Sequence, residues 1–324
     1  MQISSGSKTV HMTKTKTLGS KMTEPLVSLV ITTKNEENNI EPIMESIQAQ
    51  RYKTIETILV DNNSSDKTKE LARQYTDQVF NKGPERSAQR NFGMIEKAKG
   101  KYVMFIDCDM ILSPYLIEHC VALIEKGDYI ALHIPEIVLG RNFWSKVRRF
   151  ERSFYNGTVI DGARFFRKDK FVEVGGFDET MSGPEDWDID KKIKKIGKIG
   201  LLNSIEKNDN PLLGKAGWSL KNFILNRGVN PDQYGSVVYH NESEFNLKKY
   251  LSKKGYYATS FDGYIKKWGK DDPDIKKQLG LKYRYFGVFV ENGKWLKLIM
   301  HPFSALGMGY LRVMVGVKFI LRKN

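Results

Sequence analysis

Two carboxylates, Asp107 and Asp109, directly follow an apolar run at residues 102–106. The run is partly β-branched and predicts a buried strand. A hard divalent cation takes one or two carboxylates and fills its other positions with water and phosphate oxygens. The triplet therefore suggests a metal that holds a diphosphate. A solvated turn after a strand is the alternative, because Asp-x-Asp triplets also arise by chance.

Short apolar runs alternate with helical patterns between residue 25 and about residue 202. This alternation predicts strands at 27–33, 57–60, 102–106 and 129–134, and helices at 40–50, 66–75, 85–98, 114–126 and 185–196. It is typical of a parallel, doubly wound α/β sheet. Ligands bind beyond the carboxyl ends of the strands in such sheets. Polar clusters stand at three of these ends, at 34–36, 61–63 and 107–109.

Several common site types find no support in the sequence. No Gly-x-Gly-x-x-Gly follows the first strand and no Gly-Lys-Ser/Thr loop occurs, which argues against dinucleotide-binding and P-loop folds. Cys108 and Cys120 give neither a disulfide framework nor zinc-ligand spacing, so a reducing compartment is favoured. Any metal would be bound through oxygen ligands.

The chain is strongly basic, with a net charge of +14 over 324 residues. This indicates an anionic partner, which could be nucleic acid, nucleotide phosphates or the surface of an anionic membrane. Residues 1–24 are rich in Ser, Thr, Lys and Gly and lack the apolar core of a signal peptide. We expect them to form a disordered leader.

The pattern loosens after residue 202. A mobile loop is expected at 208–217 and helices at 220–227 and 247–257. Residues 295–321 mix apolar side chains with Lys297, Arg312 and Lys318, and the longest charge-free stretch is too short to span a bilayer as one helix. A basic, apolar helix on a membrane surface fits this segment better.

From residue 25 to about residue 200, and on toward residue 257, the sequence resembles the inverting family 2 glycosyltransferases, whose nucleotide-binding fold is called GT-A. Four motifs in family order carry the resemblance: VSLVITTKNE at 27–36, ILVDNNSSDKT at 58–68, DCD at 107–109, and GFD at 176–178 followed by EDWD at 185–188. The resemblance implies a GT-A type, doubly wound and mostly parallel α/β sheet in a catalytic domain at 25–240. A helical, membrane-associating extension would follow at 241–324.

The resemblance also implies a nucleotide-sugar site along the strand ends. Asp61 would accept a hydrogen bond from a pyrimidine ring N–H, and Arg86 and Arg90, one helical turn apart, would pair with phosphates or with acids of the site. Structural roles stay open: a strand exit for Thr33, an Asx turn for Asp61 and a solvated helix face for the arginines. The implied nucleotide-sugar contacts are Thr32, Thr33, Glu36, Asp61, Arg86, Arg90, Asp107 and Asp109.

Two residues are implied as metal ligands. Asp109 would hold Mg²⁺ or Mn²⁺, which would neutralise the departing diphosphate, while Asp107 would contact the ribose or the donor sugar. His240 resembles a histidine that some relatives contribute from downstream as a further ligand or diphosphate contact. A histidine after a β-like run is also commonly structural.

The acceptor side is implied by the motif at 185–188. Asp186 would be the catalytic base that takes the acceptor proton in a single in-line displacement, and Glu185 would hold the acceptor or the helix geometry. Asp178 would contact sugar hydroxyls or stabilise its own turn, and Trp187 would lie on the acceptor side. Acids at a helix start also commonly act as caps.

The expected function is therefore a metal-dependent, inverting transfer from a UDP-sugar to a hydroxyl of a lipid-linked glycan. We expect the protein at the cytoplasmic face of the cell membrane, in peripheral contact with anionic lipid and without a nucleic-acid partner. One alternative is a polyprenyl-phosphate glycosyltransferase, which needs no base. A nucleotidyltransferase, and a basic nucleic-acid- or membrane-binding module, are alternatives of other classes.

Overall fold

The computed structural model describes residues 24–203, 214–257 and 260–321. The leader expected at 1–24 lies outside the described residues except for Glu24. Most of the loop expected at 208–217 also lies outside them.

Among the described residues, seven strands form one sheet in the order β3-β2-β1-β4-β8-β6-β9. β1 pairs in parallel with β2 and β4, whereas β8 runs antiparallel between β4 and β6. The predicted mostly parallel sheet is confirmed, with β8 as its antiparallel member. The bounds are β1 Val27–Thr33, β2 Ile55–Asp61, β3 Val79–Asn81, β4 Tyr102–Asp107, β6 Tyr129–His133, β8 Ala163–Arg167 and β9 Lys198–Leu201.

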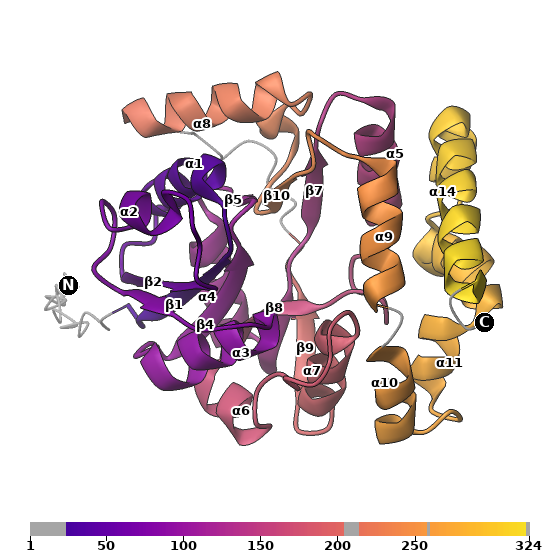
Figure 1. Ribbon diagram of the computed structural model, residues 1–324, viewed down its shortest axis with the longest axis horizontal. Coiled ribbons are helices and arrows are strands. Elements are labelled where there is room, and N and C mark those ends of the chain that lie inside the picture. The colour runs from indigo at the N-terminus through magenta and orange to yellow at the C-terminus, as the bar shows by residue number, and fades with distance from the viewer. Residues whose placement is uncertain (1–23, 204–213, 258–259, 322–324) are drawn as a thin grey trace, which may run out of the picture.

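Helices cover both faces of this sheet (Figure 1). Along β1, Leu29 and Ile31 belong to the core beneath α1 and α4, while Val30 belongs to the core beneath α7. Both faces of the strand are therefore buried, which explains why apolar residues point to both of them. The bounds are α1 Glu37–Gln48, α2 Thr68–Ala72, α3 Arg86–Asn91, α4 Leu116–Lys126, α5 Phe143–Arg152, α6 Lys168–Glu173 and α7 Glu185–Lys194.

A second sheet places His240 beside the Asp-x-Asp turn. It contains β5 (Met110–Leu112), β10 (Val238–Asn241) and β7 (Glu136–Leu139), in that order. β10 runs antiparallel to β5, with His240 opposite Met110, and parallel to β7. The backbone N–H of Asn241 donates to the carbonyl of Asp109 at 2.8 Å. A strand from late in the chain thus closes over the end of β4.

The C-terminal part is helical, as expected. α14 packs against both α5 and α9 and lies at the edge of the molecule (Figure 1). Among the described residues, no helix is both long enough and apolar enough to cross a membrane. The division at residue 240 stays a prediction. The bounds are α8 Gly214–Asn226, α9 Leu247–Tyr257, α10 Phe261–Trp268, α11 Pro273–Leu279, α12 Val288–Val290, α13 Leu296–Met300 and α14 Pro302–Leu321.

Candidate active site

The carboxyl ends of three parallel strands bring four predicted residues together. In the sheet register, Thr32 of β1 lies beside Asp107 of β4, and Thr33 lies beside Asp61 of β2. The Thr33 hydroxyl donates to Asp61 Oδ1 at 2.8 Å, and the Thr32 hydroxyl donates to Asp107 Oδ1 at 3.4 Å. The four side chains therefore form one row at this edge of the sheet, and their contact with a nucleotide stays a prediction.

Asp61 also holds its own loop in place. Its side chain is fully buried, and it accepts hydrogen bonds from the backbone N–H of Ser64 at 2.7 Å and from the Ser64 hydroxyl at 2.5 Å. These are the bonds of a carboxylate that stabilises a turn. The predicted contact with a pyrimidine ring stays a prediction.

Glu36 lies at the same edge, just before α1. Asn39 Nδ2 donates to Glu36 Oε2 at 2.7 Å. Burial, reinforced by the nearby Asp109 and Asp107 carboxylates, raises the pKa of Glu36 despite that hydrogen bond. Glu36 thus belongs to the same acidic edge as the Asp-x-Asp turn.

Arg90 connects the Asp-x-Asp turn to α7. Its side chain is 1% exposed and stacks on the Phe105 ring, 3.9 Å from the centroid. Nη2 donates to Asp107 Oδ1 at 3.0 Å and Nη1 donates to Asp186 Oδ1 at 3.1 Å. Burial opposes ionisation of Asp107, but Arg90 and Arg86 hold its pKa below the usual range. One buried guanidinium group therefore fixes an acid on each side of the site.

Arg86 and Glu185 form a second link to α7. Arg86 Nη2 donates to Glu185 Oε1 at 3.0 Å, and Glu185 is 2% exposed. Burial and the adjacent Asp186 carboxylate raise the pKa of Glu185, against the effect of Arg86. These contacts suit the helix-positioning role expected for Glu185.

Asp186 is more accessible than its neighbour in sequence. Its side chain is 35% exposed, so the carboxylate can be reached from solvent. The backbone of Gly162 approaches it closely, because a Cβ added at Gly162 would lie 2.9 Å from Asp186 Cβ. Asp186 is thus held between Arg90 and a glycine that leaves it room.

Asp109 and His240 are the residues that could hold a metal. His240 Nε2 lies 3.2 Å from Asp109 Oδ2, and Asp109 Oδ1 is buried with no hydrogen-bond partner among the described residues. A carboxylate oxygen without a partner beside an imidazole fits a divalent cation that takes its other ligands from water and phosphate. Within the described residues, no three His, Cys, Asp or Glu side chains form a complete metal site.

Sequence reasoning missed Glu136, Arg152 and Arg164. Glu136 is 5% exposed, and it accepts hydrogen bonds from His240 Nδ1 at 2.8 Å, from Arg152 Nη2 at 2.6 Å and from Arg164 Nη2 at 3.0 Å. Burial disfavours its charged form, but Arg152 and His240 hold its pKa well below the usual value. Glu136 closely follows the strand predicted at 129–134, and this position at a strand end was a signal that it could belong to the site. The sequence contains no such signal for Arg152 and Arg164.

Asp178 and Trp187 contact α10 instead of the acidic edge. The Asp178 carboxylate accepts from the Thr180 hydroxyl at 2.6 Å and from Lys267 Nζ at 2.8 Å. The centroid of the Trp187 ring lies 5.7 Å from the centroid of the Phe261 ring. These contacts give Asp178 the turn-stabilising role that the sequence left open and give Trp187 a place in a packed aromatic cluster. Their contacts with sugar or acceptor stay predictions.

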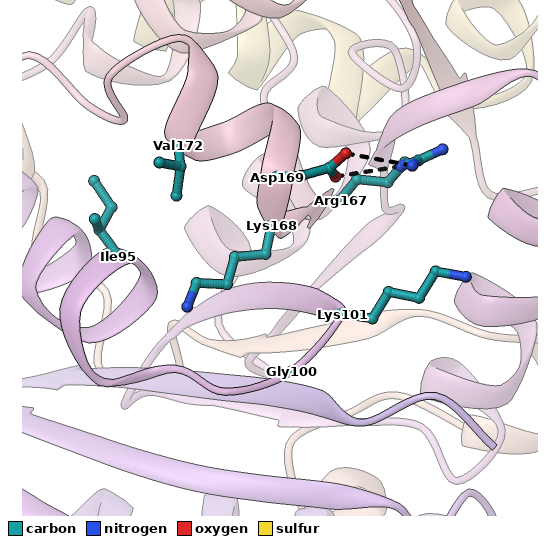
Figure 2. Close-up of a pocket in the computed structure, with 7 residues that line it drawn as sticks. All are labelled: Ile95, Gly100, Lys101, Arg167, Lys168, Asp169 and Val172. Carbon is teal, nitrogen blue, oxygen red and sulfur yellow. Dashed lines mark hydrogen bonds and ion pairs between the residues drawn. The ribbon is translucent and has the colours of Figure 1, made fainter. Parts of the chain in front are cut away.

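A separate hollow lies at the other end of β4, near Gly100 and Lys101. Figure 2 shows Arg167 paired with Asp169, two of the residues that line the hollow. Arg167 Nη2 lies 3.3 Å from Asp169 Oδ2. Gly100 and Lys101 precede the start of β4, whereas Asp107 is its last residue. The hollow is therefore not part of the candidate active site.

The sequence is similar to known glycosyltransferases. Residues 28–177 match the family described as glycosyl transferase family 2. An uncharacterized glycosyltransferase of Rickettsia typhi is 34% identical over 193 residues, which are 54% of this chain and 60% of that protein. The hyaluronan synthase of Pasteurella multocida is 24% identical over 253 residues, which are 71% of this chain and 26% of that protein. The chain thus spans less than two thirds of the length of either relative.

Solved structures share the fold. The mannosyltransferase PcManGT of Pyrobaculum calidifontis has a TM-score of 0.56 at 16% identity, with 94% of this chain and 89% of that chain covered. S. aureus TarS 1–349 has a TM-score of 0.50 at 17% identity, with 90% and 81% covered. The match over residues 28–177, which contains the strand ends and the Asp-x-Asp turn described above, and the similar relatives support a family 2 glycosyltransferase, and the solved structures share its fold.

Proposed function

We propose that the protein transfers a sugar from a UDP-sugar to an acceptor hydroxyl, with inversion and with a divalent cation. The observation that carries this proposal is the double contact of Arg90 with Asp107 and Asp186. It sets an acid of the strand-end row and a solvent-accessible carboxylate on either side of one buried cation. In a single in-line displacement, the donor and the acceptor must lie next to each other, as these two carboxylates do.

The choice of donor is supported by the neighbours of the same fold. TarS 1–349 is described in complex with UDP-GlcNAc, and PcManGT is described in complex with GDP-Man and Mn²⁺. We favour a uridine nucleotide because the row at the strand ends includes Asp61, a carboxylate suited to a pyrimidine ring N–H.

Several side chains have separate roles in the proposed reaction. Asp186 accepts the proton of the acceptor hydroxyl as the new bond forms, and the hydrogen bond from Arg90 orients this carboxylate. The Arg86–Glu185 pair anchors the first turn of α7, on which Asp186 stands. When bound by Asp109 and His240, a divalent cation would supply Lewis-acid stabilisation of the leaving diphosphate.

The proposed acceptor is a lipid-linked glycan, reached from the cytoplasmic face of the cell membrane. Support comes from the C-terminal helices, where most of the large apolar side chains exposed among the described residues lie between Leu281 and Val317. On α14 the exposed ones recur at intervals of three and four residues, which places them on one face of the helix. These side chains are Phe303, Leu306, Tyr310, Val313 and Val317.

The charge of the same segment favours an anionic lipid surface over another protein helix. Residues 276–324 contain ten Lys or Arg and a single acid, Glu291. A basic, apolar helix that lies in the headgroup region has this composition. A coiled-coil partner would instead require charges of both signs on either side of the apolar face of α14. The charged residues of α14 are Arg312 and Lys318, and Arg312 is buried.

The proposal is tested by measuring melting temperatures with a panel of nucleotide sugars, with and without Mn²⁺, because a ligand of the folded state raises the melting temperature. We expect a Mn²⁺-dependent increase with one UDP-sugar, and release of UDP on turnover. Release of pyrophosphate would identify a nucleotidyltransferase instead. Tight RNA binding without any response to nucleotide sugars would favour the nucleic-acid-binding alternative.

A further inference from the structure

We propose that Arg152 and Arg164 form a subsite for a phosphate oxygen of a substrate, next to the Asp109–His240 pair. This inference rests on the proposed function, because it names a further part of the same site. Arg152 is the last residue of α5 and Arg164 is the second residue of β8. Neither belongs to a motif that the family resemblance supplied.

Glu136 brings the two arginines together. Arg152 Nη2 and Arg164 Nη2 both donate to the same oxygen, Glu136 Oε2, at 2.6 and 3.0 Å. The other oxygen accepts from His240 Nδ1 at 2.8 Å. Two guanidinium groups that share one carboxylate oxygen lie side by side.

Each of these guanidinium groups keeps a buried donor unused. Arg152 Nε and Arg164 Nη1 are buried and have no hydrogen-bond partner among the described residues. The Arg164 side chain is only 11% exposed. A buried N–H without an acceptor is costly, so such groups in native proteins usually have a water or ligand partner. Phosphate is the anion that best matches the fork of donors on arginine.

The position of Arg164 connects this subsite to the acids already described. Its guanidinium group lies 5.2 Å from the centroid of the Phe105 ring, on which Arg90 also stacks. Burial disfavours the charge on Arg164, but the carboxylates of Glu136, Asp107 and Asp186 raise its pKa above the usual value. The subsite thus adjoins both the donor side and the acceptor side.

A phosphate oxygen at this place has two chemical sources. It can belong to the diphosphate of the donor, or to a phosphate carried by the acceptor, as a polyprenyl phosphate would have. The second source would also support the alternative reaction, in which a phosphate oxygen attacks and no base is needed. The experiment must therefore separate the two.

Lysine substitutions test the subsite with little disturbance of the ion pairs with Glu136. Arg164→Lys and Arg152→Lys keep a positive charge that can pair with Glu136, but they remove the unused guanidinium donors. The matched control is Arg167→Lys, in the same strand as Arg164 but among the residues that line the hollow shown in Figure 2, with Asp169 as partner. Melting temperatures without ligand verify that all three variants fold.

Binding is measured by calorimetry with Mn²⁺, using UDP and uridine as probes. If the phosphate is that of the donor, Arg164→Lys and Arg152→Lys weaken UDP binding by about 10- to 100-fold, the range for a lost hydrogen bond to a charged group. Uridine binding does not change, and Arg167→Lys behaves as the native protein does.

Farnesyl phosphate and farnesol are the probes for the second source. If the phosphate is that of the acceptor, UDP binding is unchanged and the preference for farnesyl phosphate over farnesol is lost in both variants. Native-like binding of UDP and of farnesyl phosphate by both folded variants would overturn the subsite. If the native protein binds no nucleotide at all, the proposed function itself fails, which is a distinct result.

Discussion

Arg90 Nη1 donates a hydrogen bond to Asp186 Oδ1 at 3.1 Å, although 96 positions separate the two residues. The bond joins α3 to the first turn of α7. Arg90 is itself fixed, because it is buried against the Phe105 ring and is also bonded to Asp107. The orientation of Asp186 therefore depends on the same buried cation that holds the end of β4.

Asp186→Asn is expected to lower kcat by about 10²- to 10⁴-fold, the usual contribution of a general base. The affinity for UDP should stay within twofold, because the amide keeps the shape of the side chain. The two effects are separated by steady-state kinetics and by nucleotide titration. Asp169→Asn, which changes an exposed carboxylate paired with Arg167, is the control. Turnover close to native in Asp186→Asn would instead favour the polyprenyl-phosphate reaction.

Gly162→Ala is expected to lower turnover, although Gly162 has no proposed contact with a substrate. The new methyl group would lie 2.9 Å from Asp186 Cβ, so the start of α7 or β8 must shift. The matched control is Gly263→Ala in α10, where an added Cβ meets nothing within 4 Å. Activity of Gly162→Ala equal to that of Gly263→Ala would show that Asp186 does not need this fixed position.

Arg312→Met is expected to lower the free energy of unfolding by about 3–5 kcal/mol, the usual cost of breaking a buried ion pair by removing one partner. Arg312 is buried in α14, and it donates to Glu151 Oε1 at 3.1 Å and to the Tyr155 hydroxyl at 2.6 Å. Urea unfolding measures the change. Lys101→Met, which breaks an exposed pair with Glu125, should cost only about 0–1 kcal/mol. Equal losses would mean that the α14 pair adds no more than a surface pair does.

The local pattern of the sequence predicted most of the strands that carry the strand-end residues. β1 was predicted at its observed bounds because a mostly apolar, β-branched run marks a strand buried on both faces. The helix predicted at 66–75 is shorter in the structure, where α2 covers Thr68–Ala72. β3, with only three residues and partial burial, has too little apolar pattern to be recognised.

The missed part of the site depends on contacts between distant residues. His240 reaches Glu136 because β10 pairs with β7, and 104 positions separate these two residues. Arg164 lies in β8, which enters the sheet antiparallel between β4 and β6. Neither pairing leaves a periodic signal, because it is selected by the packing of the whole domain. For that reason the sequence indicated Asp109 and His240 but not Glu136 and the two arginines bonded to it.

Removal of two apolar side chains from α14 should weaken membrane binding without harming the fold. Phe303 and Leu306 are 78% and 72% exposed, so Phe303→Ser with Leu306→Ser opens no cavity in the core. If each side chain enters the lipid, burial worth about 1.5–3 kcal/mol per residue predicts a loss of at least about 100-fold in vesicle affinity for the double variant. Val172→Ser, an exposed change in α6, is the control.

Vesicle composition and protein concentration decide what the exposed face of α14 binds. Binding to vesicles with anionic lipid should exceed binding to neutral vesicles and should fall as salt rises, since the segment is basic. If the face instead joins two copies of the chain, the native protein will form a concentration-dependent dimer without vesicles, and the double variant will be monomeric. That result would remove the support that the C-terminal helices give to a membrane-linked acceptor, while the proposed roles of Arg90 and Asp186 would be unaffected.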